Sequence, residues 1–343
     1  LVPHGMIREE LFESNQPREL SQTQLGAMKK RLAEEMEKGA IGMSTGLEYS
    51  PGYYASTREL IELAKVVKQY DGIYTTHMRD ESGRTDGGTP GVIVSINEAI
   101  EIARQAEIPV EISHLKINEP INDTKPEQVL ELIENARQEG LDIHADQYPY
   151  AAGSTYLTIL LPDRFKTAVG VKDKFKTKSG RADIQKAINE VFEYLPPEKT
   201  LVTMYTEKEN YEGKTVQEIA ELENREPAES YADMACEDTA PMAVFFSQDL
   251  DIVRELMPND YVLTASDGWT VPKDMTKPHP RLYGTFPKKL KQFVIYEKRM
   301  DIQMAIRSMT SLPAKKFNVN NRGMLAEGNY ADIAIINLGT ISD

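Results

Sequence analysis

The chain has 343 residues and carries 40 Lys and Arg against 54 Asp and Glu, which gives a formal net charge of −14 at pH 7. At roughly 150 residues per domain, this length fits two domains or one large α/β barrel. The acidic balance argues against nucleic acid or an anionic membrane as a partner, because phosphate binding needs a basic surface. No apolar run approaches the roughly 18 residues of a membrane span, and the single cysteine, Cys236, excludes an internal disulfide. We expect a cytoplasmic protein, and the start at Leu1 without a Met predicts a longer parent polypeptide.

The first part of the chain alternates between strand-like and helix-like segments. Ser21 and Gln24 have the spacing of a capping box, and the amphipathic stretch behind them predicts a helix over residues 20–38. Further helices are expected at 56–67, 91–103 and 126–139, and strands at 40–43, 73–77, 110–114 and 141–146. Strands and helices that alternate at this spacing predict βαβ units and a parallel sheet.

Changes in this rhythm divide the chain into regions. We expect residues 1–162 to carry successive strands of the sheet, 163–250 to be an inserted lid-like subdomain, 251–312 to hold the last strand and its helices, and 313–343 to contribute short antiparallel strands to a small β-domain. The insert is richer in Lys and Glu, and the strand pattern resumes only at residues 261–268. About five βα units can be counted, which is too few to close an eight-stranded barrel.

Two histidines lie where parallel strands end. His77 and His114 each follow an apolar strand, Asp267 ends a third strand, and Tyr148 opens the loop after a fourth. The carboxyl ends of parallel barrel strands converge on one face, which carries the active site. Neutral imidazoles bind Zn²⁺, and a carboxylate either ligates the metal or takes a proton from its water. The alternative is that each histidine is an ordinary hydrogen-bonded residue of the sheet.

Cations near these strand ends are candidates for binding a substrate carboxylate. Lys116 follows His114 by two residues and so is expected to point to the same side. Arg281 offers a planar fork suited to a carboxylate. The alternatives are a solvated surface lysine and a surface salt bridge.

Hydroxyl groups supply a further set of candidates. Tyr49, Tyr148 and Ser154 are possible donors to a carbonyl oxygen, although loop tyrosines more often serve in packing. The remaining residues of note are interpreted structurally: His4 as a turn residue, His144 as a core residue or one that supports a site residue, His279 as a positional residue before Pro280, and Cys236 as a buried thiol.

Several motifs together resemble one known family. They occur in this order: Gly46-Leu47-Glu48-Tyr49-Ser50-Pro51-Gly52, Thr76-His77-Met78-Arg79, Ser113-His114-Leu115-Lys116, Asp146-Gln147-Tyr148-Pro149-Tyr150, Ser266-Asp267-Gly268 and His279-Pro280-Arg281-Leu282-Tyr283-Gly284-Thr285. The chain resembles the D-aminoacylases, the N-acyl-D-amino-acid deacylases of the metal-dependent amidohydrolase superfamily. The resemblance covers nearly the whole chain.

The resemblance implies a (β/α)₈ TIM-type barrel, an inserted subdomain and a small β-sandwich. It implies one or two zinc ions held by His77 and His114, with Asp267 as the catalytic residue. It also implies a small-molecule N-acyl-D-amino acid substrate, cleaved to a carboxylate and a D-amino acid. Its expected contacts are Tyr49, Lys116, Tyr148, Ser154 and Arg281.

The sequence also departs from the family pattern. It has no His-x-His pair, and its cysteine lies in the insert rather than at the bridging position. We therefore expect the first strands, and further zinc ligands, upstream of Leu1. Two other functions stay open: another amidohydrolase acting on cyclic amides, of the dihydroorotase or hydantoinase kind, or a catalytically incomplete fragment.

Overall fold

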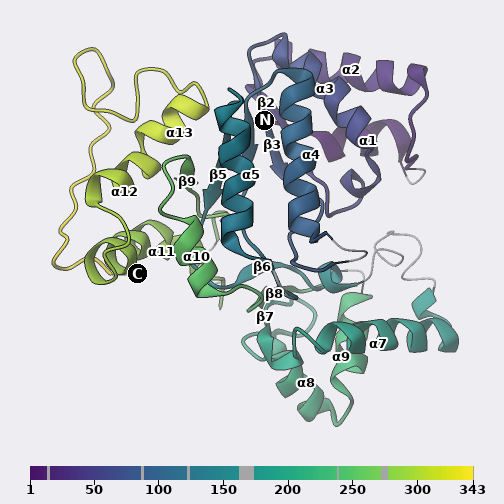
Figure 1. Cartoon of the computed structure of the whole chain (residues 1–343). Coiled ribbons are helices and arrows are strands. Elements are labelled where there is room, and N and C mark those ends of the chain that lie inside the picture. Colours follow the sequence, from purple (N-terminus) through teal and green to yellow (C-terminus); the bar gives the residue numbers. More distant parts are fainter. Residues whose placement is uncertain are drawn as a thin grey trace.

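A computed structural model describes residues 1–13, 16–85, 89–121, 124–161, 174–237, 239–271 and 277–342. Its centre is a six-stranded parallel sheet in the order β1-β2-β3-β4-β5-β9 (Figure 1). These strands are β1 (Val2–Pro3), β2 (Gly42–Gly46), β3 (Ile73–His77), β4 (Val110–Ile112), β5 (Ile143–Gln147) and β9 (Val262–Thr264). Every neighbouring pair is parallel, which confirms the predicted α/β class.

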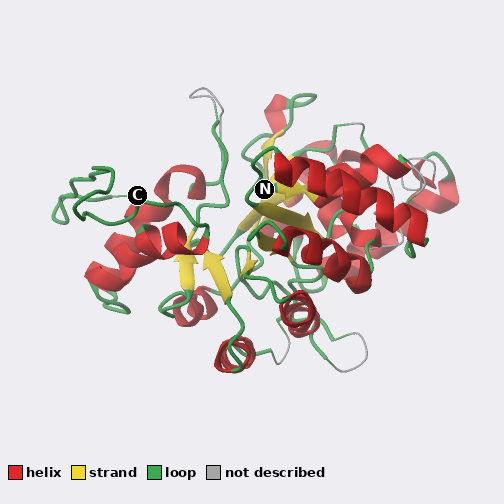
Figure 2. Ribbon diagram, turned by 90° about the horizontal axis from the view of Figure 1, so that it is seen from above, coloured by secondary structure: helices red, strands yellow, loops and turns green. Residues whose placement is uncertain are grey.

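Helices connect these strands and cover them. They are α1 (His4–Phe12), α2 (Gln22–Glu37), α3 (Thr57–Lys68), α4 (Gly91–Ala106), α5 (Pro126–Gln138) and α10 (Leu250–Leu256). The capping box at Ser21 forms as predicted, and the buried face of α2 consists of Leu25, Met28, Leu32 and Met36. In Figure 2 the strands lie toward the middle of the molecule and the helices lie around them.

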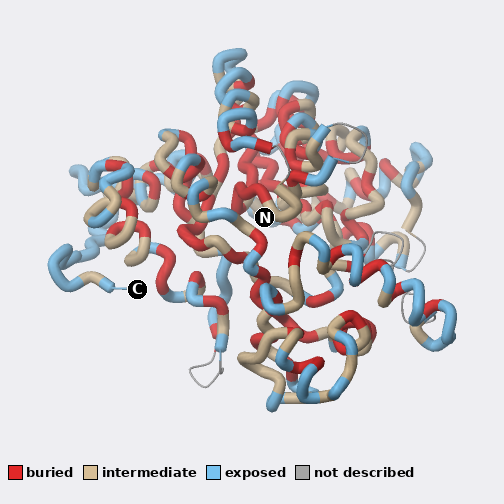
Figure 3. Tube along the Cα trace, turned by 60° about the horizontal axis from the view of Figure 1, so that its bottom comes forward, coloured by how far each residue is buried: buried red, intermediate tan, exposed pale blue. Residues whose placement is uncertain are grey.

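The apolar faces of these helices and the strands share one core. Leu32, Leu63, Ile96, Ile133 and Val262 are fully or almost fully buried in it. Figure 3 shows the buried segments gathered centrally, with exposed outer helix faces and an exposed C-terminal tail. Packing of this kind holds the sheet rigid, so the side chains at its strand ends are held in place.

A second, antiparallel sheet lies beside the first. Its order is β6-β8-β7, with β6 (Gly153–Tyr156), β7 (Thr200–Met204) and β8 (Met242–Phe245), and it packs with α7 (Lys178–Phe192), α8 (Val216–Glu223) and α9 (Pro227–Ala235) around a separate core. The elements of this unit lie between residues 153 and 245, and residues 162–173 lie outside the described part. Its first strand, β6, pairs with β8, which is distant in sequence.

Short single-turn segments join several elements. They are η1 (Gly52–Tyr54), η2 (Leu157–Leu160), η3 (Pro197–Lys199) and η4 (Glu209–Tyr211). After β9 the chain forms α11 (Arg281–Lys288), the π-helix η5 (Lys289–Tyr296), α12 (Ile302–Met309) and α13 (Ser311–Lys316). Among the described residues no helix is both long and apolar enough to cross a membrane.

The C-terminal tail differs from its prediction. Residues 317–342 contain no strand, so the antiparallel strands expected there do not form within the described residues. A strand needs a partner for its backbone N–H and C=O groups. The apolar side chains of this segment stay exposed, with Ile333 at 65% and Ile335 at 97%. Strand-like patterning is therefore present without the pairing that would make it a sheet.

His4 also differs from its prediction as a turn residue. It begins α1, is fully buried, and its Nε2 lies 2.8 Å from Glu59 Oε1 on α3. A histidine next to proline and glycine looks like a loop residue locally, and only the packing of α1 on α3 shows its partner.

Candidate metal and catalytic site

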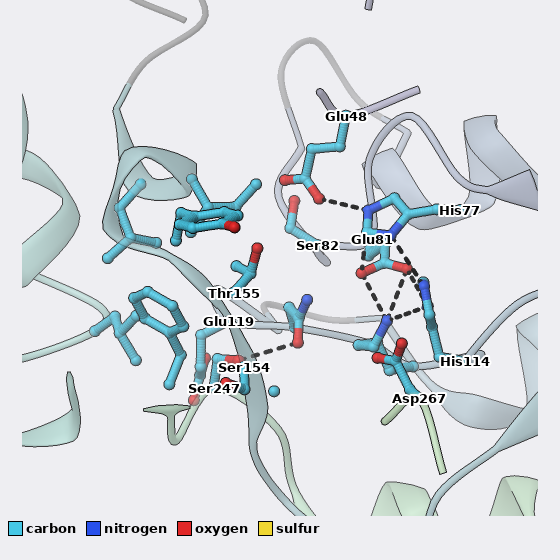
Figure 4. Close-up of a pocket in the computed structure, with 18 of the residues that line it drawn as sticks. Glu48, His77, Glu81, Ser82, His114, Glu119, Ser154, Thr155, Ser247 and Asp267 are labelled. Atoms are coloured by element: carbon cyan, nitrogen blue, oxygen red, sulfur yellow. Dashed lines mark hydrogen bonds and ion pairs between the residues drawn. The ribbon is translucent and has the colours of Figure 1, made fainter. Parts of the chain in front are cut away.

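His77 and His114 meet at the carboxyl edge of the parallel sheet. His77 is the last residue of β3, and His114 follows β4, so the pairing of these two neighbouring strands brings the rings together. His77 Nδ1 lies 2.9 Å from His114 Nε2 (Figure 4). His114 has a backbone φ of 40°, in the left-handed region that non-glycine residues rarely adopt. Such conformations cluster at functional sites, where surrounding contacts hold them.

Carboxylates flank this histidine pair on both sides. Glu48 Oε2 lies 3.0 Å from His77 Nε2, and Glu81 Oε1 lies 3.0 Å from His114 Nδ1. Each carboxylate therefore faces the ring nitrogen opposite to the one that meets the other histidine. Lys116 Nζ lies 2.7 Å from both oxygens of Glu81 and 2.6 Å from His114 Nδ1.

Glu81, like Glu48, is a site residue that the sequence analysis missed. Its side chain is 4% exposed, and it stands four residues after His77, in the loop that leaves β3. The run Arg79-Asp80-Glu81 looks like ordinary loop charge. The available signal was its short distance in sequence from a strand-end histidine.

In this cluster, opposite charges stabilise the charged forms of the buried groups and so shift their pKa values. Burial alone would raise the pKa of Glu81, but Lys116 and the two histidines outweigh it and hold that pKa well below its usual range. Burial alone would lower the pKa of His77, yet Glu81 and Glu48 raise it. The pKa of Lys116 is likewise raised, since the charge of Glu81 overcomes the effect of burial.

These side chains fit a divalent metal ion. His77, Glu81 and His114 offer ligand atoms that all lie within 4.8 Å of one another. Imidazole nitrogens are donors that zinc prefers, and a nearby carboxylate either ligates the metal or orients the imidazoles that do. The convergence of His77 Nδ1 and His114 Nε2 marks where an ion would be held.

Asp267 and Arg281 form a second charged pair at this cavity. Asp267 lies three residues beyond β9 with a φ of 46°, and its Oδ2 lies 2.9 Å from Arg281 Nη1. Arg281 begins α11 and is 2% exposed, and its Nη2 donates to the carbonyl oxygen of Ser154 at 3.1 Å. Its buried Nε has no hydrogen-bond partner among the described residues. This guanidinium therefore has a donor left for a ligand.

The predicted hydroxyl donors line the same cavity. Tyr148 is 1% exposed, and its hydroxyl oxygen accepts from Gln248 Nε2 at 3.1 Å. Burial raises the pKa of Tyr148, so this group keeps its proton at neutral pH. Tyr49 hydrogen-bonds to Thr155 at 3.2 Å, and its ring centroid lies 4.8 Å from that of His77.

All eight predicted site residues line one cavity of about 1360 Å³. It extends from the histidine pair to apolar side chains of the inserted unit, among them Leu160, Val191 and Phe245. His279 is a different case: it is buried, and its Nε2 lies 3.0 Å from the carbonyl oxygen of Ala152, a positional role as predicted.

A parallel α/β fold with a histidine–carboxylate cluster at the carboxyl ends of its strands defines a class of metal-site proteins, and the comparisons agree. The amidohydrolase family profile matches residues 199–343. The D-aminoacylase of Alcaligenes xylosoxydans xylosoxydans is 30% identical over 343 residues, covering 100% of this chain and 61% of that protein. N-acyl-D-glutamate deacylase of the same organism is 29% identical, covering 92% of this chain and 56% of that protein. The chain thus spans about 60% of the length of the curated relatives it matches.

Solved structures agree with these sequence matches. A crystal structure of D-aminoacylase shares 30% identity at a TM-score of 0.76, over 96% of this chain and 59% of that one. N-acyl-D-glutamate deacylase from Bordetella bronchiseptica, complexed with zinc and a phosphonate inhibitor, shares 28% identity at a TM-score of 0.77, over 96% of this chain and 60% of that one. The chain is therefore similar along its length to the D-aminoacylases, and its residues 199–343 match the amidohydrolase family profile.

Proposed function

We propose that this chain carries the active site of a zinc-dependent hydrolase that cleaves the amide bond of an N-acyl-D-amino acid to a carboxylate and a D-amino acid. The observation that carries this proposal is the meeting of His77, His114 and Asp267 in one cavity, in a chain 30% identical to a D-aminoacylase. The partner is a small molecule.

The metal would be held by His77 Nδ1 and His114 Nε2, the two nitrogens that face each other. When bound, zinc supplies Lewis-acid activation of water and of the scissile carbonyl. Every other part of the chemistry falls to side chains of this chain.

Asp267 is the proposed general base and acid. Arg281 holds Oδ2 of this carboxylate, which leaves the other oxygen for proton transfer. Asp267 would take a proton from the attacking water and deliver it to the nitrogen of the leaving amine. The side chain is 36% exposed, so water and substrate reach it.

Tyr148 and Arg281 would bind the two oxygen-bearing ends of the substrate. The Tyr148 hydroxyl accepts from Gln248 and has no acceptor for its own proton among the described residues, so it is placed to donate to the developing oxyanion. The unpartnered Nε of Arg281 would donate to the substrate carboxylate. Lys116, Tyr49 and Ser154 complete the set that selects the D-configuration.

The test is Asp267→Asn, assayed with zinc on N-acetyl-D-amino acids, their L-enantiomers and hydantoins. General acid–base groups contribute about 10²- to 10⁴-fold. We therefore expect kcat on the D-substrates to fall by that factor while bound zinc is retained. Asp251→Asn is the matched control, because Asp251 is also paired with an arginine, at 2.8 Å, but lies outside the cavity. Full turnover by Asp267→Asn would refute the role, and a preference for hydantoins would refute the substrate class.

A further inference from the structure

We propose that Glu81 and Glu48 are positioning residues that hold His114 and His77 in the ring orientation and tautomer needed to bind a metal. The proposal rests on the metal site of the proposed function. It adds two residues for which the sequence predicted no role.

The argument starts from the two faces of each ring. His77 and His114 approach each other through Nδ1 and Nε2 at 2.9 Å, and a carboxylate lies 3.0 Å from the remaining nitrogen of each ring. Each ring thus has one nitrogen facing the other histidine and one facing a carboxylate, and at His114 the second nitrogen also lies 2.6 Å from Lys116 Nζ. Glu48 comes from the loop after β2, and Glu81 from the loop after β3.

A neutral imidazole carries one proton and one lone pair. To ligate a metal, His114 must present its lone pair at Nε2 and therefore carry its proton at Nδ1. A carboxylate is an acceptor only, so Glu81 at Nδ1 favours that tautomer and fixes the plane of the ring. The same reasoning gives Glu48 the corresponding role at His77 Nε2.

The position of Lys116 allows the positioning role of Glu81 to be tested separately from its charge pairing with Lys116. Its ammonium has three donors, and its contacts are the two oxygens of Glu81 and His114 Nδ1. Lys116 as a donor to Nδ1 favours the opposite tautomer, with the proton on Nε2. Glu81 thus competes with Lys116 for the same ring nitrogen, and it also draws the ammonium toward itself at 2.7 Å.

The experiment measures zinc affinity of the purified full chain by competition with a chromophoric chelator. Loss of such an outer partner weakens metal binding by about 10- to 100-fold, and we expect this for Glu81→Gln. Because that variant leaves buried Lys116 unpaired, the second protein is Glu81→Gln with Lys116→Met, which removes one charge of each sign. If Glu81 positions His114, the double variant stays weak. If Glu81 only neutralises Lys116, the double variant regains wild-type affinity and the proposal is overturned.

Glu98→Gln is the matched control. Glu98 is a partly buried carboxylate with a bidentate contact to Arg79, at 2.9 and 3.0 Å, and does not touch either histidine. Its zinc affinity should equal that of the wild type. Glu48→Gln should weaken binding as Glu81→Gln does.

Nitrogen-15 NMR of histidine in the zinc-loaded chain gives a readout independent of catalysis. We expect the ring proton on Nδ1 of His114 and on Nε2 of His77, and the reverse assignment would overturn the proposal. These results separate the two proposals. Tight zinc binding that is indifferent to Glu81 and Glu48 removes only the positioning role, whereas weakened binding without amide hydrolysis removes only the function. A wild-type chain that binds no zinc removes both.

Discussion

At the scale of single residues, the site depends on backbone conformations that cost free energy. His114 and Asp267 both have positive φ, at about 1–3 kcal/mol each for a non-glycine residue. Asp146 offsets the first, because its Oδ1 accepts the backbone N–H of His114 at 2.7 Å. Arg281 holds the carboxylate of the second. The strained backbone at His114 and Asp267 is thus held by contacts with Asp146 and Arg281.

A substitution of Arg281 tests whether this residue binds the substrate. In Arg281→Lys a single ammonium replaces a fork that bonds Asp267 and Ser154 and leaves Nε for a ligand. Hydrogen bonds to charged groups contribute about 1.5–3 kcal/mol, so we expect KM for N-acyl-D-amino acids to rise roughly 10- to 100-fold. Steady-state kinetics measures this. Arg254→Lys, in a pair with Glu297 outside the cavity, is the control, and an unchanged KM in Arg281→Lys contradicts the assignment.

The burial of Lys289 leads us to predict that the stability of the folded protein depends on pH. It is 1% exposed, contacts Thr264 and Ser308, and burial lowers its pKa to about 7. An unfolded lysine titrates near 10.4. Between these pH values the unfolded chain binds more protons, so the contribution of this group to stability rises with pH, by at most about 1.4 kcal/mol per unit.

Urea unfolding of the wild type and Lys289→Met at pH 7, 8 and 9 checks this effect. We expect the variant to be more stable at pH 7, and its advantage to shrink as the pH rises. Thr264 and Ser308 hydrogen-bond to each other at 2.9 Å, a contact that the substitution does not remove. A difference that does not change with pH would show that Lys289 stays charged in the folded protein.

At the scale of elements, a buried polar group joins α1 to α3. Glu59 of α3 is 3% exposed and is bound by His4 Nε2 at 2.8 Å and by Arg8 Nη1 at 2.6 Å. Both partners are fully buried. This contact fixes the first helix against the sheet, beside the edge strand β1.

Glu59→Gln should destabilise the protein by about 3–5 kcal/mol, since it leaves the charge of Arg8 buried without its counter-ion. Denaturant unfolding measures the loss. Glu62→Gln on the same helix is the control, because Glu62 pairs with Lys29 and Lys65 near the surface and such pairs contribute about 1 kcal/mol or less. Equal losses in the two variants would contradict a special role for the buried network.

At the scale of the whole molecule, two cores meet at one cavity. The parallel sheet supplies the histidines and Asp267, and the inserted unit supplies an apolar wall. A metal bound between β3 and β4 therefore links residues that the chain brings together only when folded.

Zinc should stabilise the folded chain as a whole. At a free zinc concentration of 100 times Kd, the expected gain is about 2.7 kcal/mol, and chelator should reverse it. Thermal unfolding with and without zinc measures the shift. The double variant His77→Ala, His114→Ala should lose the response, while His144→Ala, whose ring lies beside Asp142 and outside the cavity lining, should keep it. A response that survives the double variant would place the metal elsewhere.

The parts predictable from the sequence were those with local causes. Caps and apolar periodicity marked α2, α3 and α5, and apolar runs marked β3, β4 and β9. The strand-end positions of His77, His114 and Asp267 were visible for the same reason. Errors arose where a distant partner decides the outcome: His4 needs Glu59, and the tail finds no strand to pair with among the described residues.

The sequence alone therefore determined the α/β class, the family resemblance and the set of side chains at the strand ends, because each is recorded in neighbouring residues. Only the tertiary structure decided which of these groups touch: that two ring nitrogens lie 2.9 Å apart, that Arg281 holds Asp267, and that Glu81 contacts both Lys116 and His114. Such contacts depend on strand pairing and core packing between residues far apart along the chain, which no local pattern contains.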